Sequence, residues 1–315
     1  MQALYWDGRI LRLESSRPTP ATDQETVLVR VHLAGICSTD LQIFKGYMGF
    51  RGVPGHEFVG TVSEGPRELL GKRVVGEINF ACGHCDYCNR GLERHCPKRS
   101  VMGILNADGA FAEFVSVPVA NLHVVPDGVS DEEAVFTEPL AAAFEILQQV
   151  QPGPGDEVLI GDGKLGSLCA QVLRLTGARV TALGKHEEKL KIIKRAGVRT
   201  VLLKDWKPRL FDVVIEVTGS ESGLQLAISA VRPRGTLVLK STIAGEHHVS
   251  VAPLVINEIT VIGSRCGPFA PALEALEERT VSVTPLIEKV YPLSYAVDAV
   301  SHAERGGTRK ILLRP

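Results

Sequence analysis

The stretch Val158–Gly166, VLIGDGKLG, decides the fold of one half of the chain. It opens with three apolar residues, as expected for a buried parallel strand. The next six residues match G-x-G-x-x-G, and the apolar residues that follow recur at helical spacing. A second apolar run, Arg179–Leu183, comes at the distance that a strand–helix–strand unit requires. The pattern predicts a dinucleotide-binding unit; the alternative is a glycine-rich turn in some other α/β domain.

The three glycines have different tasks in such a unit. Gly161 allows a tight turn, Gly163 lets the backbone approach a pyrophosphate, and Gly166 lets helix and strand pack closely. The helix N-terminus offers N–H groups to the phosphates. The predicted cofactor-binding residues are Gly161, Gly163, Lys164, Leu165, Gly166, Gly184, Lys185, His186, Lys189, Thr218 and Gly219.

The end of the second predicted strand bears on the choice of cofactor. NAD-binding units usually carry a carboxylate there, which accepts a hydrogen bond from the adenosine ribose 2′-hydroxyl. This chain has Gly184 instead, followed by Lys185, His186 and Lys189. A glycine leaves room for a 2′-phosphate and basic side chains attract it, so the sequence favours NADP over NAD. The alternative is that these basic residues are only a solvated helix start.

The composition is that of an ordinary globular protein. The chain has 315 residues, 44% of them hydrophobic and 23% charged, with a formal net charge of −1. We therefore expect a small-molecule substrate, no nucleic-acid partner and no membrane association. Seven cysteines, four of them crowded together, indicate metal binding in a reducing compartment, and we expect the cytoplasm.

The character of the chain changes near Pro139. Alternating apolar residues in Val27–Leu33 predict a half-buried strand, and the first part as a whole predicts an antiparallel β domain. After Pro139, six predicted strands alternate with helices, which predicts a doubly wound parallel sheet. The expected domains are residues 1–139, residues 140–267, and a tail, residues 268–315, that returns to the first domain.

Cys82, Cys85, Cys88 and Cys96 follow the spacing C-x2-C-x2-C-x7-C. Four thiolates this close in sequence suit a closed tetrahedral zinc site, which is structural because no coordination position stays open. An iron–sulfur cluster is the alternative, but the spacing differs from that of ferredoxins.

Three further segments carry metal-binding side chains: Gly35–Asp40 (GICSTD), Gly55–Glu57 (GHE) and Thr137–Leu140 (TEPL). A thiolate, an imidazole and carboxylates suit a catalytic zinc with one open position. Together with the four cysteines and the dinucleotide unit, and in this order, they resemble the zinc-dependent medium-chain dehydrogenase/reductase family. The glutamate before Pro139 is similar to the sorbitol and threonine dehydrogenase branch.

The resemblance covers essentially the whole chain. It implies a discontinuous GroES-like N-terminal β domain that carries both zinc sites and a Rossmann NAD(P)-binding domain, with the active site in the cleft between them. It also implies a homo-oligomer, a dimer or a tetramer, formed through the last strands of the nucleotide domain around Val261 and Ile262.

The family pattern also implies roles for single residues. Cys37 and His56 would be fixed ligands of the catalytic zinc, Glu57 a third or exchangeable ligand, and Glu138 a ligand directly or through water. Thr39 would pass the substrate proton. Two smaller implications are that Asp40 braces the site and that Arg309 contacts a phosphate.

The activity implied is hydride transfer between NAD(P) and a small alcohol, polyol or hydroxy-amino acid and its carbonyl, with two zinc ions per chain. One departure from the family concerns the proton relay, because Gln42 stands where many members have a titratable histidine. Two alternatives remain: a family member that reduces an enone or imine, and a catalytically silent NADP-binding protein with only a structural zinc. The retained Cys37, His56 and Thr39 weigh against both.

Overall fold

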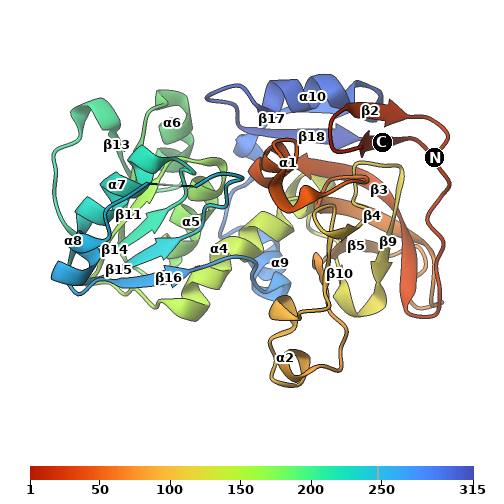
Figure 1. Ribbon diagram of the computed structural model, residues 1–315, viewed down its shortest axis with the longest axis horizontal. Helices are drawn as coiled ribbons and strands as arrows, with labels where there is room; N and C mark the ends of the chain where they lie inside the picture. Colours follow the sequence, from red (N-terminus) through yellow and green to blue (C-terminus); the bar gives the residue numbers. More distant parts are fainter. Residues whose placement is uncertain (247) are drawn as a thin grey trace. The chain divides into compact units, whose positions relative to one another are not determined.

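The computed structural model describes residues 1–246 and 248–315, which form two compact units (Figure 1). The first unit comprises Met1–Glu138 and Ile287–Pro315, and the second comprises Pro139–Leu286. No helix in the described ranges is long and apolar enough to cross a membrane.

The first unit is built on a sheet in which β10, β5, β4, β3, β18 and β17 lie in this order, with β9 also paired to β3. The pairs are antiparallel except for β17 and β18. The strands of this sheet are β3 (Thr26–Ile36), β4 (Glu57–Glu64), β5 (Arg73–Gly76), β9 (Phe114–Pro118), β10 (Leu122–Val124), β17 (Ile287–Pro292) and β18 (Lys310–Arg314). Two smaller sheets contain β1 (Ala3–Trp6) with β2 (Leu11–Glu14), and β6 (Asn79–Phe80) with β7 (Ser100–Met102) and β8 (Asn106–Ala107). The helices are α1 (Ser38–Ile43), α2 (Asp86–Asn89), α3 (Asp131–Ala134) and α10 (Ala296–Ala303).

The long strand β3 shows why this sheet forms. Its residues Val27, Val29, Val31 and Leu33 are all buried, as their alternation predicts. Beyond Leu33 every residue of the strand is buried, and β18 pairs with this part of β3. The strand therefore ends deep in the first unit, and Cys37 follows directly.

The second unit is a six-stranded parallel sheet with the strand order β13, β12, β11, β14, β15, β16. In chain order this is 3-2-1-4-5-6, the arrangement of dinucleotide-binding sheets. The strands are β11 (Glu157–Gly161), β12 (Arg179–Gly184), β13 (Arg199–Leu202), β14 (Phe211–Glu216), β15 (Val231–Leu239) and β16 (Thr260–Gly263). The helices are α4 (Thr137–Gln149, whose first two residues belong to the first unit), α5 (Lys164–Leu175), α6 (Glu187–Arg195), α7 (Glu221–Ala230), α8 (Ala252–Ile256) and α9 (Phe269–Glu277).

The helices of the second unit pack in two pairs. Helix α5 contacts α6, and α7 contacts α8. The chain winds outward from β11 in both directions, so right-handed crossovers place the two pairs on opposite faces of the sheet. Both faces are thus covered, which explains why the central strands are continuous apolar runs, with Val158, Leu159 and Ile160 all buried.

The predicted point of return to the first domain needs a correction. The sequence placed it at residue 268, whereas the segment up to Leu286 groups with the second unit. Helix α9 buries an apolar face that includes Phe269 and Leu276. Beyond the helix, Ser282 exchanges two hydrogen bonds with the buried amide of Gln171 on α5. These contacts tie the segment to the nucleotide-type sheet, and the chain rejoins the first unit only at β17.

Candidate metal centres and nucleotide-binding edge

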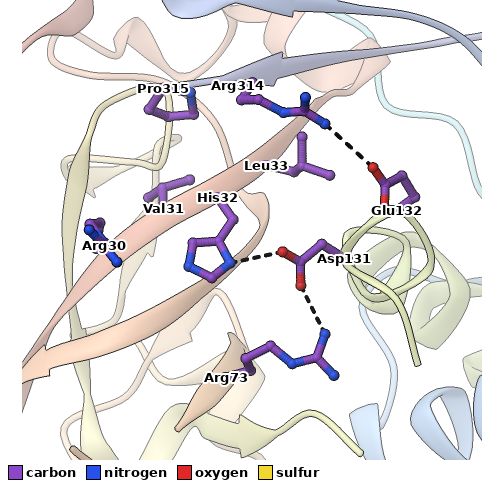
Figure 2. Close-up of a pocket in the computed structure, with 9 residues that line it drawn as sticks. All are labelled: Arg30, Val31, His32, Leu33, Arg73, Asp131, Glu132, Arg314 and Pro315. Carbon is purple, nitrogen blue, oxygen red and sulfur yellow. Dashed lines mark hydrogen bonds and ion pairs between the residues drawn. The ribbon is translucent and has the colours of Figure 1, made fainter. Parts of the chain in front are cut away.

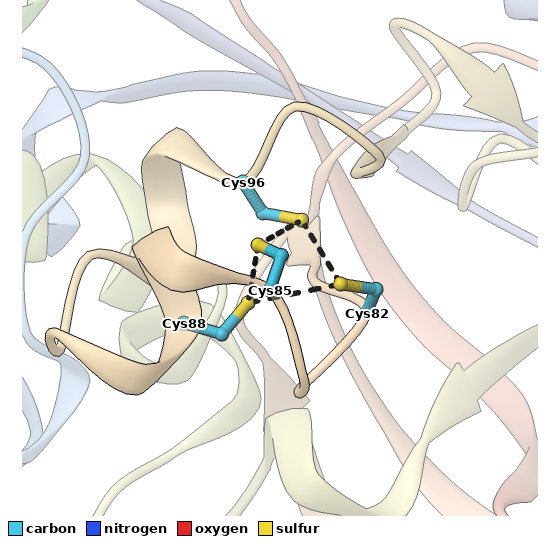
Figure 3. A group of neighbouring side chains, drawn as sticks. All are labelled: Cys82, Cys85, Cys88 and Cys96. Carbon is cyan, nitrogen blue, oxygen red and sulfur yellow. Dashed lines mark hydrogen bonds between the residues drawn. The ribbon is translucent and has the colours of Figure 1, made fainter.

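The four cysteines predicted as a zinc site come together in a lobe around α2 (Figure 3). We call Cys82, Cys85, Cys88 and Cys96 the cysteine lobe. The Sγ–Sγ distances are 3.5 Å for Cys85 and Cys88, 3.6 Å for Cys82 and Cys96, 3.7 Å for Cys85 and Cys96, and 4.0 Å for Cys82 and Cys88. A tetrahedron with Zn–S bonds of about 2.3 Å has S–S edges of about 3.8 Å. The lobe therefore fits a zinc ion without rearrangement.

The thiols of the cysteine lobe differ in their acidity. Backbone N–H groups, first that of His84, lower the pKa of Cys82 to about 6, although burial opposes them. Burial, together with hydrogen bonds to the neighbouring thiols, raises the pKa of Cys88 to about 11. Four thiolates at these distances repel one another, so a divalent cation is needed to hold all four in the ionised form.

A second group of metal-binding side chains lies in the first unit. One ligand atom each from Cys37, His56 and Glu57 lies within 4.8 Å of the others, and we call these residues the mixed cluster. Cys37 follows β3, and Glu57 opens β4 at the position paired with Gly35. The antiparallel register thus joins segments about twenty residues apart. A side chain at position 35 would overlap the Glu57 carboxylate, which explains why glycine stands there.

Two further residues of the Gly35–Asp40 segment surround the mixed cluster. The carboxylate of Asp40 is fully buried, and its Oδ2 accepts a hydrogen bond of 2.7 Å from the Cys37 backbone N–H. Its Oδ1 lies 3.2 Å from Nδ1 of His56, although these two atoms are not aligned for a hydrogen bond. Thr39 Oγ1 lies 3.8 Å from the Cys37 sulfur. Asp40 thus contacts both predicted fixed ligands, and a hydroxyl lies beside one of them.

The sequence analysis missed Lys310, which lies against the mixed cluster. This lysine opens β18, is almost fully buried, and donates to both Glu57 carboxylate oxygens at 2.8 Å and 2.5 Å. The contact spans 253 positions along the chain. The sequence does contain a signal for this lysine, because Lys310 is followed directly by three apolar residues of the same strand. The neighbouring residue Arg309 was predicted to contact a phosphate. Its backbone N–H donates a hydrogen bond to the Glu288 carboxylate, and its side chain forms an ion pair with the same carboxylate.

The charges around the mixed cluster favour a divalent cation. The Cys37 sulfur and the carboxylates of Asp40 and Glu57 surround two basic side chains, the His56 imidazole and the Lys310 ammonium. Burial lowers the pKa of His56, but Asp40 and Cys37 raise it more, to well above its ordinary value. Burial likewise opposes the charge on Lys310, but Glu57 raises its pKa. The buried negative charge that stabilises both cations is what a metal ion would neutralise.

Glu138, the fourth predicted ligand, is not among the residues that the structure brings together in the mixed cluster. It is half-buried and lies in the first turn of α4, where a carboxylate is favoured by the helix dipole. Its part in metal binding stays a prediction.

The predicted cofactor-binding residues gather at one edge of the parallel sheet. They follow the carboxyl ends of β11, β12 and β14, which are adjacent strands. Gly163 caps the N-terminus of α5, and a side chain at Gly166 would overlap the Gly161 carbonyl group. This is the close helix–strand packing that the third glycine of the motif predicts.

The loop after β14 is organised by a residue that the sequence analysis missed. Buried Glu216 accepts hydrogen bonds at one oxygen from the N–H and hydroxyl of Thr218, both at 2.6 Å, and from the Gly219 N–H at 3.2 Å. Gly219 also donates to the Ser241 hydroxyl. The backbone of Thr218 and Gly219 is therefore held by the protein itself, which fixes the shape of this part of the edge.

A surface pocket of about 570 Å³ lies elsewhere on the first unit (Figure 2). It shares no residue with the mixed cluster. Five of its charged or titratable side chains are paired: Asp131 bonds to His32 and Arg73, and Arg314 lies 3.4 Å from Glu132. With most of its polar side chains bonded to one another, the pocket lacks the set of convergent unpaired groups expected of an active site.

Comparison with known proteins connects both units to one class of enzyme. Residues 23–127 match the family model "Alcohol dehydrogenase GroES-like domain", and residues 165–279 match "Zinc-binding dehydrogenase". D-arabinitol dehydrogenase 1 of Uromyces fabae is 30% identical over 100% of this chain and 97% of its own length. Sorbitol dehydrogenase of Halalkalibacterium halodurans is 30% identical over 98% of this chain and 96% of its own.

Two crystal structures extend the comparison. A protein from Escherichia coli CFT073, described as a short chain alcohol dehydrogenase in complex with NADH, is 26% identical with a TM-score of 0.89, over 100% of this chain and 99% of that one. A zinc-binding dehydrogenase from Sinorhizobium meliloti 1021 bound to NADP is 25% identical with a TM-score of 0.88, with the same coverage. Similar folds thus bind either dinucleotide, so the likeness alone does not decide between NAD and NADP.

Proposed function

The chain belongs to the zinc-dependent medium-chain dehydrogenase/reductase family, and from that membership we propose that it transfers a hydride between NAD(P) and a small alcohol or polyol and its carbonyl compound. Polyol dehydrogenases are among the relatives that match the chain over nearly its whole length. The observation that carries the proposal for this chain is the mixed cluster, where three ligand types suited to catalytic zinc meet and two of them, His56 and Glu57, are buried.

Cys37, His56 and Glu57 would hold the catalytic zinc, with Glu138 as a further ligand directly or through water. Zinc supplies a Lewis acid that polarises the substrate oxygen. The resulting ligand set of sulfur, nitrogen and oxygen leaves a coordination position for that oxygen. The cysteine lobe would hold a second, structural zinc, because its four thiolates close the coordination sphere.

The surrounding residues would prepare the site for the reaction. Asp40 orients Cys37 through the backbone N–H and faces the His56 ring, so that both ligands keep one position. Lys310 holds the buried Glu57 carboxylate through hydrogen bonds to both of its oxygens. Thr39, whose hydroxyl lies near the Cys37 sulfur, would receive the substrate proton and pass it on, a task that Gln42 cannot take because an amide does not titrate.

The nucleotide edge of the second unit would bind the dinucleotide. The N-terminus of the twelve-residue helix α5 would face the pyrophosphate, and the loop that Glu216 holds would line the nicotinamide half. Lys185, His186 and Lys189 are the residues that favour NADP in the sequence. The carboxylate of Asp162, which bonds to the backbone of Lys185 and His186, favours NAD instead.

Two further parts of the proposal concern the state of the protein. A homo-oligomer would form through β16, which is an edge strand with Val261 exposed and Ile262 half-buried, beside the exposed Val255 and Ile256 of α8. The cytoplasm is the expected compartment, because the cysteine lobe binds zinc only in its reduced form.

The test combines metal analysis with a substrate screen. Purified protein should contain two zinc ions per chain, and it should reduce NAD(P) in the presence of members of a panel of C4–C6 polyols and short secondary alcohols. One zinc per chain with dinucleotide binding but no turnover on alcohols, carbonyls, enones or imines would overturn the proposal and leave a silent dinucleotide-binding protein.

A further inference from the structure

The carboxylate that the sequence lacks at the end of β12 is supplied from the glycine-rich loop. Asp162, the second residue of G-x-G-x-x-G, is half-buried, and its side chain reaches the end of the neighbouring strand. Its Oδ2 accepts hydrogen bonds from the backbone N–H groups of Lys185 at 3.0 Å and His186 at 3.3 Å. Its own N–H donates to the Leu183 carbonyl at 3.0 Å. Asp162 is therefore fixed to β12 through three hydrogen bonds.

Gly184 is the counterpart of this arrangement. A Cβ atom built at Gly184 would overlap the Asp162 carboxylate itself. The carboxylate thus occupies the space where the side chain of a strand-end aspartate or glutamate would begin. The glycine that seemed to leave room for a 2′-phosphate leaves room for Asp162 instead.

We propose that Asp162 sets the cofactor preference by accepting a hydrogen bond from the adenosine ribose 2′-hydroxyl, which makes the protein select NAD over NADP. The inference rests on the proposed function, because it assigns a residue of the same dinucleotide site. A carboxylate at the end of the second strand is the group that binds this hydroxyl in NAD-specific sheets. Asp162 presents the same group at the same strand end from a different position in the chain.

The remaining acceptor capacity of Asp162 supports this role. Both hydrogen bonds that its carboxylate accepts use Oδ2, and Oδ1 makes none to any part of the chain that the structure describes. A carboxylate oxygen of this kind is able to accept from a hydroxyl. A 2′-phosphate would bring up to two negative charges against it.

The basic residues next to Gly184 do not offset this effect. The backbone N–H groups of Lys185 and His186, which would otherwise be donors for a 2′-phosphate, already bond to Asp162. The side chains of both residues are exposed, where water and salt weaken charge interactions. Glu187 and Glu188, which follow directly, add negative charge at the same helix start.

Fluorescence titration of the full chain with NADH and with NADPH tests the proposal without any substrate. The wild type should bind NADH more tightly. Asp162→Asn keeps the shape and an acceptor for Lys185 and His186 but removes the charge, so the ratio of the two dissociation constants should move toward NADPH by about tenfold or more. Glu187→Gln, which removes the next carboxylate along the chain, is the matched control and should change the ratio by less than about twofold.

A reciprocal pair of variants distinguishes a specific role from a structural one. Gly184→Asp alone should lose binding of both dinucleotides, because its side chain collides with Asp162. Adding Asp162→Gly removes the collision and moves the carboxylate to the strand end, so the double variant should regain the preference for NADH. The comparison that decides is with Asp162→Gly alone, which lacks both carboxylates and should lose the preference, whereas a purely structural Asp162 predicts the wild-type ratio in this parent.

The outcomes separate this inference from the proposed function. The role of Asp162 would be overturned if the wild type bound NADPH more tightly than NADH and Asp162→Asn left the ratio of the two dissociation constants unchanged. The protein would then still be a dinucleotide-dependent enzyme. The role of Asp162 would also be overturned if the single variant Asp162→Gly had the same ratio of NADH and NADPH dissociation constants as the wild type. Binding of neither dinucleotide would instead contradict the proposed function itself.

Discussion

The cysteine lobe and the mixed cluster are two candidate zinc sites in the same unit, and they are built in opposite ways. The lobe takes four identical ligands from one segment of fifteen residues. The mixed cluster takes three different ligands from the ends of β3 and β4, with a counter-ion, Lys310, from the far end of the chain. The lobe is closed by its own ligands, whereas the mixed cluster depends on its surroundings for position and charge.

This difference has consequences for what each site does. A zinc ion bound by four thiolates has no open position and contributes to local folding. A site with mixed ligands and a nearby hydroxyl keeps a position for substrate, but its buried charges have to be balanced by residues that are not ligands. Removing one ligand at each site should therefore have different effects, and the two substitutions serve as controls for each other.

The largest free-energy effect is expected in the cysteine lobe. Cys96→Ser removes a buried thiol from the proposed structural zinc site, and structural zinc sites contribute roughly 10–16 kcal/mol to local folding. We expect the zinc content to fall from two ions per chain to one, and the amides of residues 82–96 to lose protection from hydrogen exchange. Metal analysis and hydrogen-exchange mass spectrometry measure both. Full protection of the lobe in this variant would mean that its fold does not depend on zinc.

Cys37→Ser should act on turnover rather than on local folding. A catalytic zinc typically contributes several kcal/mol of transition-state stabilisation, so if the mixed cluster holds one, activity should fall by about a thousandfold or more. Hydrogen exchange in the cysteine lobe should stay as in the wild type, and one zinc per chain should remain. Steady-state kinetics and metal analysis check the two halves of this expectation. Wild-type turnover in the variant would contradict the assignment of the mixed cluster as the catalytic site.

Lys310→Met tests whether the mixed cluster depends on its counter-ion. Breaking a buried ion pair from one side costs about 3–5 kcal/mol, because the Glu57 carboxylate is left without its ammonium. Urea unfolding of the metal-free protein should show this loss, and Lys310→Arg, which keeps the charge, should show much less of it. A loss as large in the arginine variant would indicate that packing, and not charge, stabilises this position.

The pH dependence of that difference follows from the raised pKa of Lys310. A raised pKa means that the folded state holds the proton more tightly than the unfolded state does. The stabilisation is then complete below about pH 10.5, the ordinary lysine value, and is lost as the pH rises through the higher folded-state pKa. The free energies of unfolding of wild type and Lys310→Met should therefore converge only at strongly alkaline pH.

The same contrast explains which parts of the site the sequence predicted. The cysteine lobe and the strand–helix–strand around Gly161 are local patterns, in which spacing alone fixes geometry. Lys310 and Glu57 lie 253 positions apart, and no local rule pairs them. The pairing of β18 with β3 brings Lys310 beside the mixed cluster, and only the folded sheet reveals it.

Asp162 shows a second reason why sequence rules fall short. The rule for NAD specificity refers to the end of the second strand, and at that position the chain has a glycine. The carboxylate that we propose for this role follows a neighbouring strand, whose end lies at the same edge of the sheet. A rule written for one position in the chain misses a group that reaches the same point in space from another.

The smallest of these effects is expected from Asp40→Asn, which sharpens the comparison because Asp40 is not a ligand. The asparagine keeps the size of the side chain and an acceptor for the Cys37 N–H, but it removes the negative charge near His56. Groups that orient metal ligands typically contribute 10- to 100-fold to metal affinity, so the mixed cluster should lose zinc at about 10- to 100-fold lower chelator concentration. The cysteine lobe should release its zinc as in the wild type.

Asp131→Asn, which alters the pair with His32 elsewhere in the same unit, is the matched control and should change neither site. Equal weakening at both sites would mean that Asp40 supports the unit as a whole, and the distinction between a self-contained site and one held by its surroundings would then fail.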